Sequence, residues 1–289
     1  MYHIEASNFD KGTAYAVFDG HTMNDMTPYA YKTTDFGKTW KNIISYDVVG
    51  FVRNIQEDYE NPNLLFLGTE FGLYITIDGG EKWYKFTNNM PAVAVHFIDL
   101  QKQTNDLVMG THGRGVIIID DISPLRELSD EVMDKKVHFF KSEPTVMWEE
   151  GAFSDSFGIE TQFVGGNPNR SAQIKYYLKK RHTFGKMTME VQDMNGHVIS
   201  SLSPGKSKGI NIVNWMYSMK QPKVAKGKTF SFGGFTSPRV EAGTYKVVLK
   251  KGRDSYEHLI EVIYNSTSLL SEVERKQKHQ TTMKMYDIT

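Results

Sequence analysis

Short apolar runs separated by turns rich in glycine, asparagine and aspartate occupy most of the 289-residue chain. Runs of four to eight residues bounded by such turns are typical of β-strands. In the first 125 residues they recur with a fixed period. Leu64–Glu70 resembles Leu107–His112 about 42 residues later, and Ile55 and Ile98 are 43 residues apart. A period near 43 filled with short strands is what a four-stranded blade of a β-propeller requires.

A second repeated segment predicts a tight turn in each of the first two periods. Thr33–Trp40 reads TTDFGKTW, and Thr76–Trp83 reads TIDGGEKW. The aspartate can accept backbone N–H bonds within the turn, and the glycine supplies a positive φ. The threonine hydroxyl can tie the turn to its strand, and the tryptophan is expected to insert between neighbouring blades. The residues given this structural role are Thr33, Asp35, Gly37, Trp40, Thr76, Asp78, Gly80 and Trp83.

The pattern S/T-x-D-x-G-x-T-W resembles the Asp-box, or BNR repeat. This repeat occurs in sialidases, in oligoxyloglucan-type glycoside hydrolases and in sortilin-like receptor propellers. The first copy matches fully, whereas the second has Lys82 where threonine is usual. Gly110–Leu125 resembles the last-blade ending of large bacterial proteins that are labelled sortilin-like or glycosyl-hydrolase-like, many of them similar to secreted proteins of Bacteroidetes. This resemblance implies a secreted, periplasmic or outer-surface protein.

The third period is incomplete. Ile117–Asp121 leads directly into Ser123 and Pro124, with no boxed turn and no fourth strand. Propellers need about four to eight blades to close. Residues 1–122 are therefore predicted to be the C-terminal blades of an Asp-box β-propeller. Its remaining blades would come from the N-terminal part of the same protein or from another chain.

The second half of the chain predicts a different β domain. Residues 123–155 are interpreted as a linker with a short helix and strands, and residues 149–172 as linker and loop. Asn195-Gly196 is a strong hairpin signal. Six or seven short strands around Trp215 predict an Ig-like β-sandwich over residues 156–265. The order of the motifs D-x-N-G, G-x-N-x-V-x-W and A-G-T-Y resembles the Ig-like domain of flagellar hook-cap proteins. The strands are expected at Ile174–Leu178, Met187–Asp193, Val198–Leu202, Gly209–Trp215, Gly243–Leu249 and His258–Ile263.

Two further segments of this half have distinct patterns. Gln221–Arg239 is too polar for a core strand and predicts a long exposed loop. Residues 266–289 predict a helical tail, in which Leu269, Leu270, Val273 and Lys276 recur near the helical period. The complete prediction is an all-β chain, with a partial Asp-box β-propeller of about three blades, an Ig-like β-sandwich and a short C-terminal helix.

Composition and charge exclude several classes of function and site. The chain has 34 basic and 34 acidic residues, but residues 1–125 carry a net charge of −7 and the remainder +7, which supports two domains. The basic half is too dilute for a nucleic-acid binder. With no cysteine, the chain has no disulfide, zinc–thiolate site or catalytic thiol. No metal or cofactor is predicted, no run is long enough for a membrane span, and the N-terminus does not resemble a signal peptide.

Candidate chemistry lies in the loops between the second and third strands of each blade and in the loops between blades. These loops open on one face around the propeller axis. Asp25 and Glu70 are the only same-face carboxylates from adjacent blades that could flank a glycosidic bond, although solvated loop carboxylates are the alternative. His21, His112 and Arg114 are ligand-face candidates, and Arg114 could either clamp a carboxylate or phosphate or belong to a tight turn. Other polar groups on this face are Asp19, Tyr46, Asp47, Asn88 and Asn89.

Three functions remain open from the sequence. The first is recognition of a protein or carbohydrate ligand by a secreted or surface propeller, which the sortilin-like resemblance favours. The second is a glycoside hydrolase whose catalytic carboxylates lie mostly on blades outside this chain, which the family label favours. The third is a structural role for the Ig-like domain as a spacer in a surface assembly. Fold alone does not decide among them.

Overall fold

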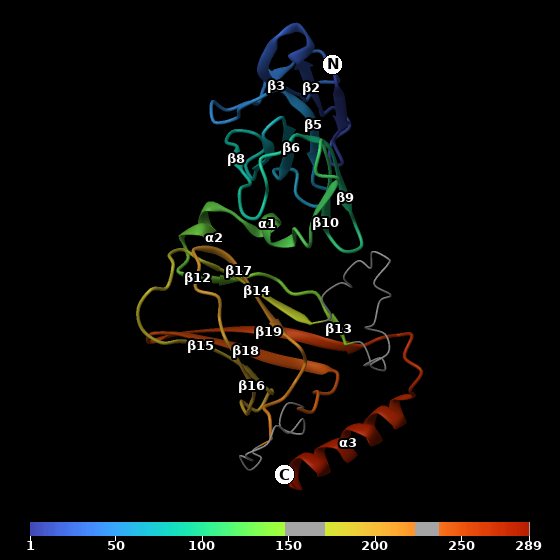
Figure 1. The fold of residues 1–289 in the computed structure, drawn as a ribbon, viewed down its shortest axis with the longest axis vertical. Coiled ribbons are helices and arrows are strands. Elements are labelled where there is room, and N and C mark those ends of the chain that lie inside the picture. The colour runs from blue at the N-terminus through green and yellow to red at the C-terminus, as the bar shows by residue number, and fades with distance from the viewer. Residues whose placement is uncertain (148–170, 223–236, 289) are drawn as a thin grey trace. The chain divides into compact units, whose positions relative to one another are not determined.

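A computed structural model describes residues 1–147, 171–222 and 237–288 (Figure 1). It divides into two compact units, Met1–Val132 and Met133–Thr289, which we call the propeller unit and the sandwich unit. Most of the loops predicted at 149–172 and Gln221–Arg239 lies outside the described residues. The finer domain boundaries at residues 122, 155 and 265 stay predictions.

The propeller unit consists of three antiparallel sheets in which consecutive strands pair side by side. The first two sheets have four strands and the third has three, as the repeat predicted. Blade 1 contains β1 (His3–Ala6), β2 (Ala14–Gly20), β3 (Asp25–Thr33) and β4 (Lys41–Asn42), with the 3₁₀ helix η1 (His21–Met23) between β2 and β3; blade 2 contains β5 (Val52–Glu57), β6 (Leu65–Thr69), β7 (Gly72–Thr76) and β8 (Tyr84–Lys85); blade 3 contains β9 (Val95–Gln101), β10 (Asp106–Thr111) and β11 (Val116–Ile119).

The three sheets pack face to face through two apolar clusters. Tyr15 and Val17 of blade 1 pack against Leu65 and Leu67 of blade 2. A second cluster joins the opposite face of blade 2 to blade 3. Because alternate residues of a strand point to opposite faces, each central blade must be apolar on both faces, and β6 is buried along its whole length. The unit is therefore a run of three β-propeller blades.

The two repeated turns have the same internal hydrogen bonds. In the second turn, the Thr76 hydroxyl donates to Asp78 (2.6 Å) and accepts from the Gly80 amide (3.1 Å). In the first, the Thr33 hydroxyl makes the corresponding bonds to Asp35 (2.9 Å) and Gly37 (3.0 Å). Both glycines have positive φ, as the sequence predicted.

The tryptophans that end these two turns have different surroundings. Trp83 is 1% exposed and its indole N–H donates to the carbonyl of Ile43 in blade 1 (2.6 Å). Trp40 is 40% exposed, and its indole N–H returns to Gly37 of its own turn (3.1 Å). The predicted insertion between blades is thus found for Trp83, whereas Trp40 lies on the uncovered face of blade 1.

The sandwich unit has a three-stranded sheet, β12-β14-β17, and a five-stranded sheet, β13-β19-β18-β15-β16. Their inner faces enclose one core around Trp215, Tyr176 and Tyr217. The predicted strands and the β-sandwich are confirmed, while the Ig-like resemblance stays a prediction. The strands are β12 (Val137–Phe139), β13 (Thr145–Met147), β14 (Ala172–Leu178), β15 (Met187–Gln192), β16 (Val198–Leu202), β17 (Gly209–Trp215), β18 (Gly243–Lys251) and β19 (Asp254–Tyr264).

The described residues also form three α-helices. Pro124 lies in the first turn of α1 (Ser123–Glu127), which together with α2 (Asp130–Asp134) follows the last blade. The predicted helical tail is α3 (Glu272–Ile288). Ser271 and Glu274 form a capping box at its start, since the Ser271 hydroxyl donates to Glu274 and accepts from its amide, while Glu274 also accepts from the Ser271 amide.

Candidate functional site

The candidate site lies at the end of the blades opposite the repeated turns. In blades 1 and 2 the third strand runs from the loop end to the boxed turn, so Asp25 begins the nine-residue strand β3 and the turn at Asp35 follows its other end. The hydrogen bonds of Asp35, chiefly from Thr39, hold its pKa below the usual range. Burial alone would raise the pKa of Asp78, but its bonds from Thr76 and from backbone amides lower it. Both carboxylates accept hydrogen bonds within their own turns.

At the loop end, Asp19 of blade 1 is the centre of a polar network. Its side chain is only 4% exposed and accepts from both the ring Nδ1 (2.6 Å) and the backbone amide (2.9 Å) of His21. The Arg53 Nε of blade 2 lies 3.2 Å from the other carboxylate oxygen. Burial opposes ionisation of Asp19, yet these hydrogen bonds and the Arg53 charge leave its pKa lowered.

Arg53 extends the network from blade 1 to blade 3. Its guanidinium donates to the Tyr2 hydroxyl (3.1 Å) and lies over the Tyr2 ring at 5.0 Å. The same NH1 nitrogen lies 3.5 Å from Nδ1 of His96, whose ring stacks on His112 with centroids 5.4 Å apart. On the other side, His21 stacks on Phe51 at 4.6 Å. We call this set the Arg53 cluster; its members are Tyr2, Asp19, His21, Phe51, Arg53, His96 and His112.

Electrostatics favour neutral imidazole at His96. Desolvation is the main cause of its lowered pKa, and the neighbouring Arg53 and His112 add to it. A neutral imidazole can both donate and accept a hydrogen bond. The cluster therefore offers neutral donors and acceptors and aromatic faces, together with a guanidinium whose charge Asp19 balances.

The sequence candidates have different places in this face. His21 and His112 belong to the Arg53 cluster. Arg114 is exposed in the tight turn between Gly113 and Gly115, both of which have positive φ. Asp25 bonds within its own hairpin, to the Thr27 amide (3.0 Å) and the Tyr29 hydroxyl (2.9 Å), which lowers its pKa. Glu70 is half-buried in the β6–β7 turn. Their pairing as catalytic acids stays a prediction.

Tyr2, Phe51, Arg53 and His96 were not among the sequence candidates. Arg53 and His96 are 43 residues apart and stand at the second position of β5 and β9. The repeat that aligns Ile55 with Ile98 therefore also aligns these two residues. That spacing was the available signal for a shared site on the innermost strands.

A second polar group lies further along the innermost strands. Glu57 is 1% exposed and accepts four bonds: two from the Ser7 hydroxyl (2.9 and 3.0 Å), one from the Asn8 amide (2.6 Å) and one from the Tyr15 hydroxyl (2.9 Å). Glu5 bonds to Gln56 beside it. Burial, with the charge of Glu57 and more weakly that of Asp99, raises the pKa of Glu5 to about 7.

Neither group resembles a metal centre. In residues 1–147, 171–222 and 237–288, no three histidine or acidic side chains are arranged to hold a metal ion. Over the same residues, no helix has the length and apolar character needed to cross a membrane.

Comparison with known proteins gives no family assignment. No protein-family model matches the chain, and no curated protein matches it. Among solved structures, a GH74 enzyme of Niastella koreensis is 14% identical with a TM-score of 0.36, over 61% of this chain and 26% of that one. An ancestral GH74 enzyme is 12% identical with a TM-score of 0.34, over 94% and 37%. The extracellular domain of a B. thetaiotaomicron protein described as a hybrid two component system is 8% identical with a TM-score of 0.33, over 91% and 32%.

The chain thus spans about a quarter to two-fifths of the length of these structures. At such TM-scores the similarity carries no argument about activity. The assignment of propeller blades rests on the strand order and face-to-face packing described above.

Proposed function

We propose that the propeller unit is part of an Asp-box propeller that recognises a protein or carbohydrate ligand at the Arg53 cluster. We further propose that the protein is secreted or displayed on the cell surface. Further blades of the same repeat, from the same polypeptide or another chain, complete the ring. The observation that supports recognition is the convergence of aromatic, imidazole and guanidinium groups from three blades, with the nearest carboxylate already paired.

The uncovered face of blade 1 supports the proposal of a further blade. Tyr74 and Trp83 of blade 2 are almost fully buried by blade 1. Their counterparts 43 residues earlier are Tyr31 and Trp40, and these line an open apolar groove of about 640 Å³ together with Phe18 and Tyr29. The groove repeats the chemistry of the seam between blades 1 and 2, so the occupant that fits it is another blade.

Light scattering of the 289-residue chain tests this part. We expect concentration-dependent association, because an exposed apolar face of this kind drives contact. Tyr31→Glu should reduce association, whereas Tyr46→Glu should not, since Tyr46 is a 94% exposed loop residue outside the groove. A chain that stays monomeric from low to high protein concentration and melts cooperatively would contradict the proposal.

Ligand recognition is tested separately by binding to arrays of neutral oligosaccharides and of extracellular-matrix peptides. Arg53→Gln and His96→Ala should abolish any binding found, because they remove the link between the three blades. Lys38→Gln, in the repeated turn at the opposite end, is the matched control and should bind normally. Binding that survives Arg53→Gln would place the ligand elsewhere.

A glycoside hydrolase is the second candidate, and Glu5 is the observation in its favour. A carboxyl group with a pKa near 7 suits a general acid, and the ionised partner would come from Asp99 or from blades outside this chain. The assembled propeller should then release reducing sugar from a β-glucan, and Glu5→Gln should stop it. Unchanged hydrolysis in Glu5→Gln would remove Glu5 from this role.

A further inference from the structure

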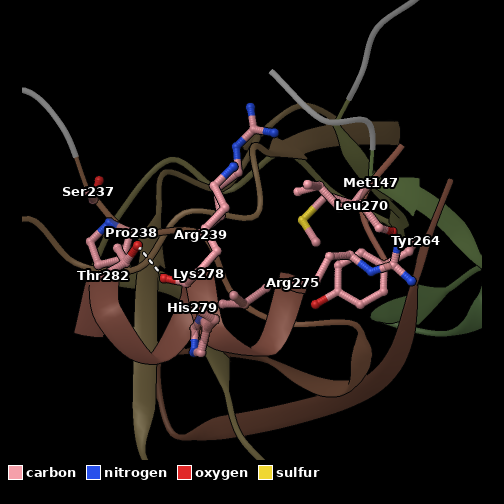
Figure 2. A pocket seen from close by; sticks show the side chains of 11 residues that line it. Met147, Ser237, Pro238, Arg239, Tyr264, Leu270, Arg275, Lys278, His279 and Thr282 are labelled. Carbon is pink, nitrogen blue, oxygen red and sulfur yellow. Dashed lines mark hydrogen bonds between the residues drawn. The ribbon is translucent and has the colours of Figure 1, made fainter. Parts of the chain in front are cut away.

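Helix α3 presents a cationic stripe to the sandwich unit. Arg275, Lys278, His279 and Thr282 are spaced i, i+3, i+4 and i+7, so they share one face of the helix. All four line a cavity against the sandwich, shown in Figure 2. A docked surface helix usually turns its apolar stripe inward. Here Val273 is 75% exposed, and the inward stripe is polar.

The cavity opposite this stripe has an apolar wall. Met147 and Tyr264 are paired neighbours on the parallel strands β13 and β19, and Val240 and Leu270 complete the wall. The volume is about 270 Å³, roughly nine times the ~30 Å³ that one water molecule occupies in the liquid. A guest with several non-hydrogen atoms therefore fits.

Four basic side chains line the cavity: Arg239, Arg275, Lys278 and His279. Arg275 stacks over the Tyr264 ring at 4.5 Å and donates through NH1 to the carbonyl of Leu270, while its Nε is buried with no hydrogen-bond partner. A carboxylate oxygen of Glu241 lies 3.8 Å from Nε2 of His279. Within the described part of the chain, neither Arg275 nor Lys278 forms an ion pair with a carboxylate. A buried donor without an acceptor lowers the stability of the fold, so an oxyanion that accepts from Arg275 Nε would remove this cost.

We infer that this cavity binds a small organic anion, with its carboxylate between Arg275 and Lys278 and its apolar body against Met147, Val240 and Leu270. Guanidinium and ammonium groups recognise carboxylate through charge-assisted hydrogen bonds. The apolar wall selects a ligand with a hydrocarbon or aryl body over a bare inorganic ion. The site is independent of the Arg53 cluster and of the proposed propeller function.

Benzoate and benzamide are the matched probes, because they share shape and differ in charge. In an NMR titration of the full chain, benzoate should shift the amide signals of Val240, Tyr264 and Lys278. Benzamide should bind at least about tenfold more weakly, as expected for loss of a charge-assisted pair. Inorganic sulfate, the third probe, should bind more weakly than benzoate.

Two variants and a control locate the site. Lys278→Gln and Arg275→Gln should each weaken benzoate binding about tenfold or more. Lys278 is exposed, so its replacement should leave folding intact. Lys276→Gln removes the same charge one residue outside the stripe and should bind as the parent does. Equal affinity for benzoate and benzamide, tighter binding of sulfate, or equal loss in Lys276→Gln would each overturn the assignment.

Discussion

Trp83 and Trp40 occupy the same position in successive repeats, and they offer a matched test of the blade packing. Trp83→Ala removes an indole that is 1% exposed between blades 1 and 2. Trp40→Ala removes one that is 40% exposed on the uncovered face of blade 1. The same substitution is therefore made at the same position of two equivalent turns, one covered by a neighbouring blade and one uncovered.

The expected costs differ severalfold. Truncating a buried tryptophan to alanine costs about 3–5 kcal/mol, which includes the cavity left behind. Trp83→Ala also leaves the Ile43 carbonyl without its 2.6 Å donor. Trp40 bonds within its own turn and is partly solvated, so we expect its loss to cost only about 1–2 kcal/mol.

Amide hydrogen exchange of Leu65 and Leu67 is the suitable assay, because these buried amides of β6 report on the propeller unit alone. A single unfolding curve would mix two units. Trp83→Ala should lower their protection by about two to four orders of magnitude, and Trp40→Ala by about tenfold. Equal losses in the two variants would refute the claim that blade 1 seals Trp83 and leaves Trp40 uncovered.

Four further outcomes are expected. Asp78→Ala should destabilise the propeller unit by about 1–3 kcal/mol, as measured by the same exchange, and leave ligand affinity unchanged; a stably folded variant without binding would contradict this. Glu5 has its folded pKa raised to about 7, so its stabilising contribution is complete below about pH 4.5 and is lost as pH rises through 7; the melting temperature of Glu5→Gln relative to the parent should therefore rise across that window, and a flat difference would be the negative result. Arg126→Ala should destabilise the propeller unit by about 3–5 kcal/mol, as measured by the same exchange, because it leaves the fully buried Asp58 without its cation, and a loss below about 1 kcal/mol would show that water reaches the site. Residues 133–289 expressed alone should melt cooperatively by calorimetry, and a molten product would mean that the sandwich depends on the propeller unit.

The strands and turns could be predicted because their signals are local. The alternation of apolar and polar residues, the Asn-Gly pair and the repeated Thr-x-Asp-x-Gly pattern each depend on only a few neighbouring residues. The structure has strands and turns at the positions that these patterns predict. The Arg53 cluster depends on contacts between distant residues: Asp19, His96 and Tyr2 lie 34, 43 and 51 positions from Arg53. Only the period of the repeat carried that information.

The C-terminal helix shows where periodicity alone was insufficient. The spacing placed Leu269, Leu270 and Val273 together in a helical tail predicted over residues 266–289. The Ser271–Glu274 capping box instead begins the helix at Glu272, so Leu269 and Leu270 precede it. Val273 is exposed, and the inward face is the cationic one. The cap sets the start of the helix, and the start determines which side chains belong to it.

The third repeat explains how a blade packs without a complete box. At the 43-residue period, Asp121 corresponds to Asp78, whereas Arg126 stands where Trp83 stands in blade 2. The Asp121 carboxylate still accepts the Ser123 amide (3.0 Å). Arg126, like Trp83, reaches the preceding blade, where it pairs with Asp58 through Nε (2.9 Å) and lies over the Tyr59 ring at 4.4 Å.

Because a guanidinium stands where blade 2 has an indole, this position is stabilised by a different kind of interaction. An indole is held mainly by apolar burial, so a smaller apolar replacement loses contact area gradually. A buried ion pair stabilises only while both partners are present, because either charge alone is strongly unfavourable in that environment. Arg126 also bonds to Asn105 of blade 3 (2.6 Å), and the side-chain amide of Asn61 in blade 2 donates to the Arg126 carbonyl (3.0 Å), so polar contacts hold α1 to both blades. The seam between blades 2 and 3 therefore adds a buried ion pair to its apolar cluster, at the position where an indole fills the seam between blades 1 and 2.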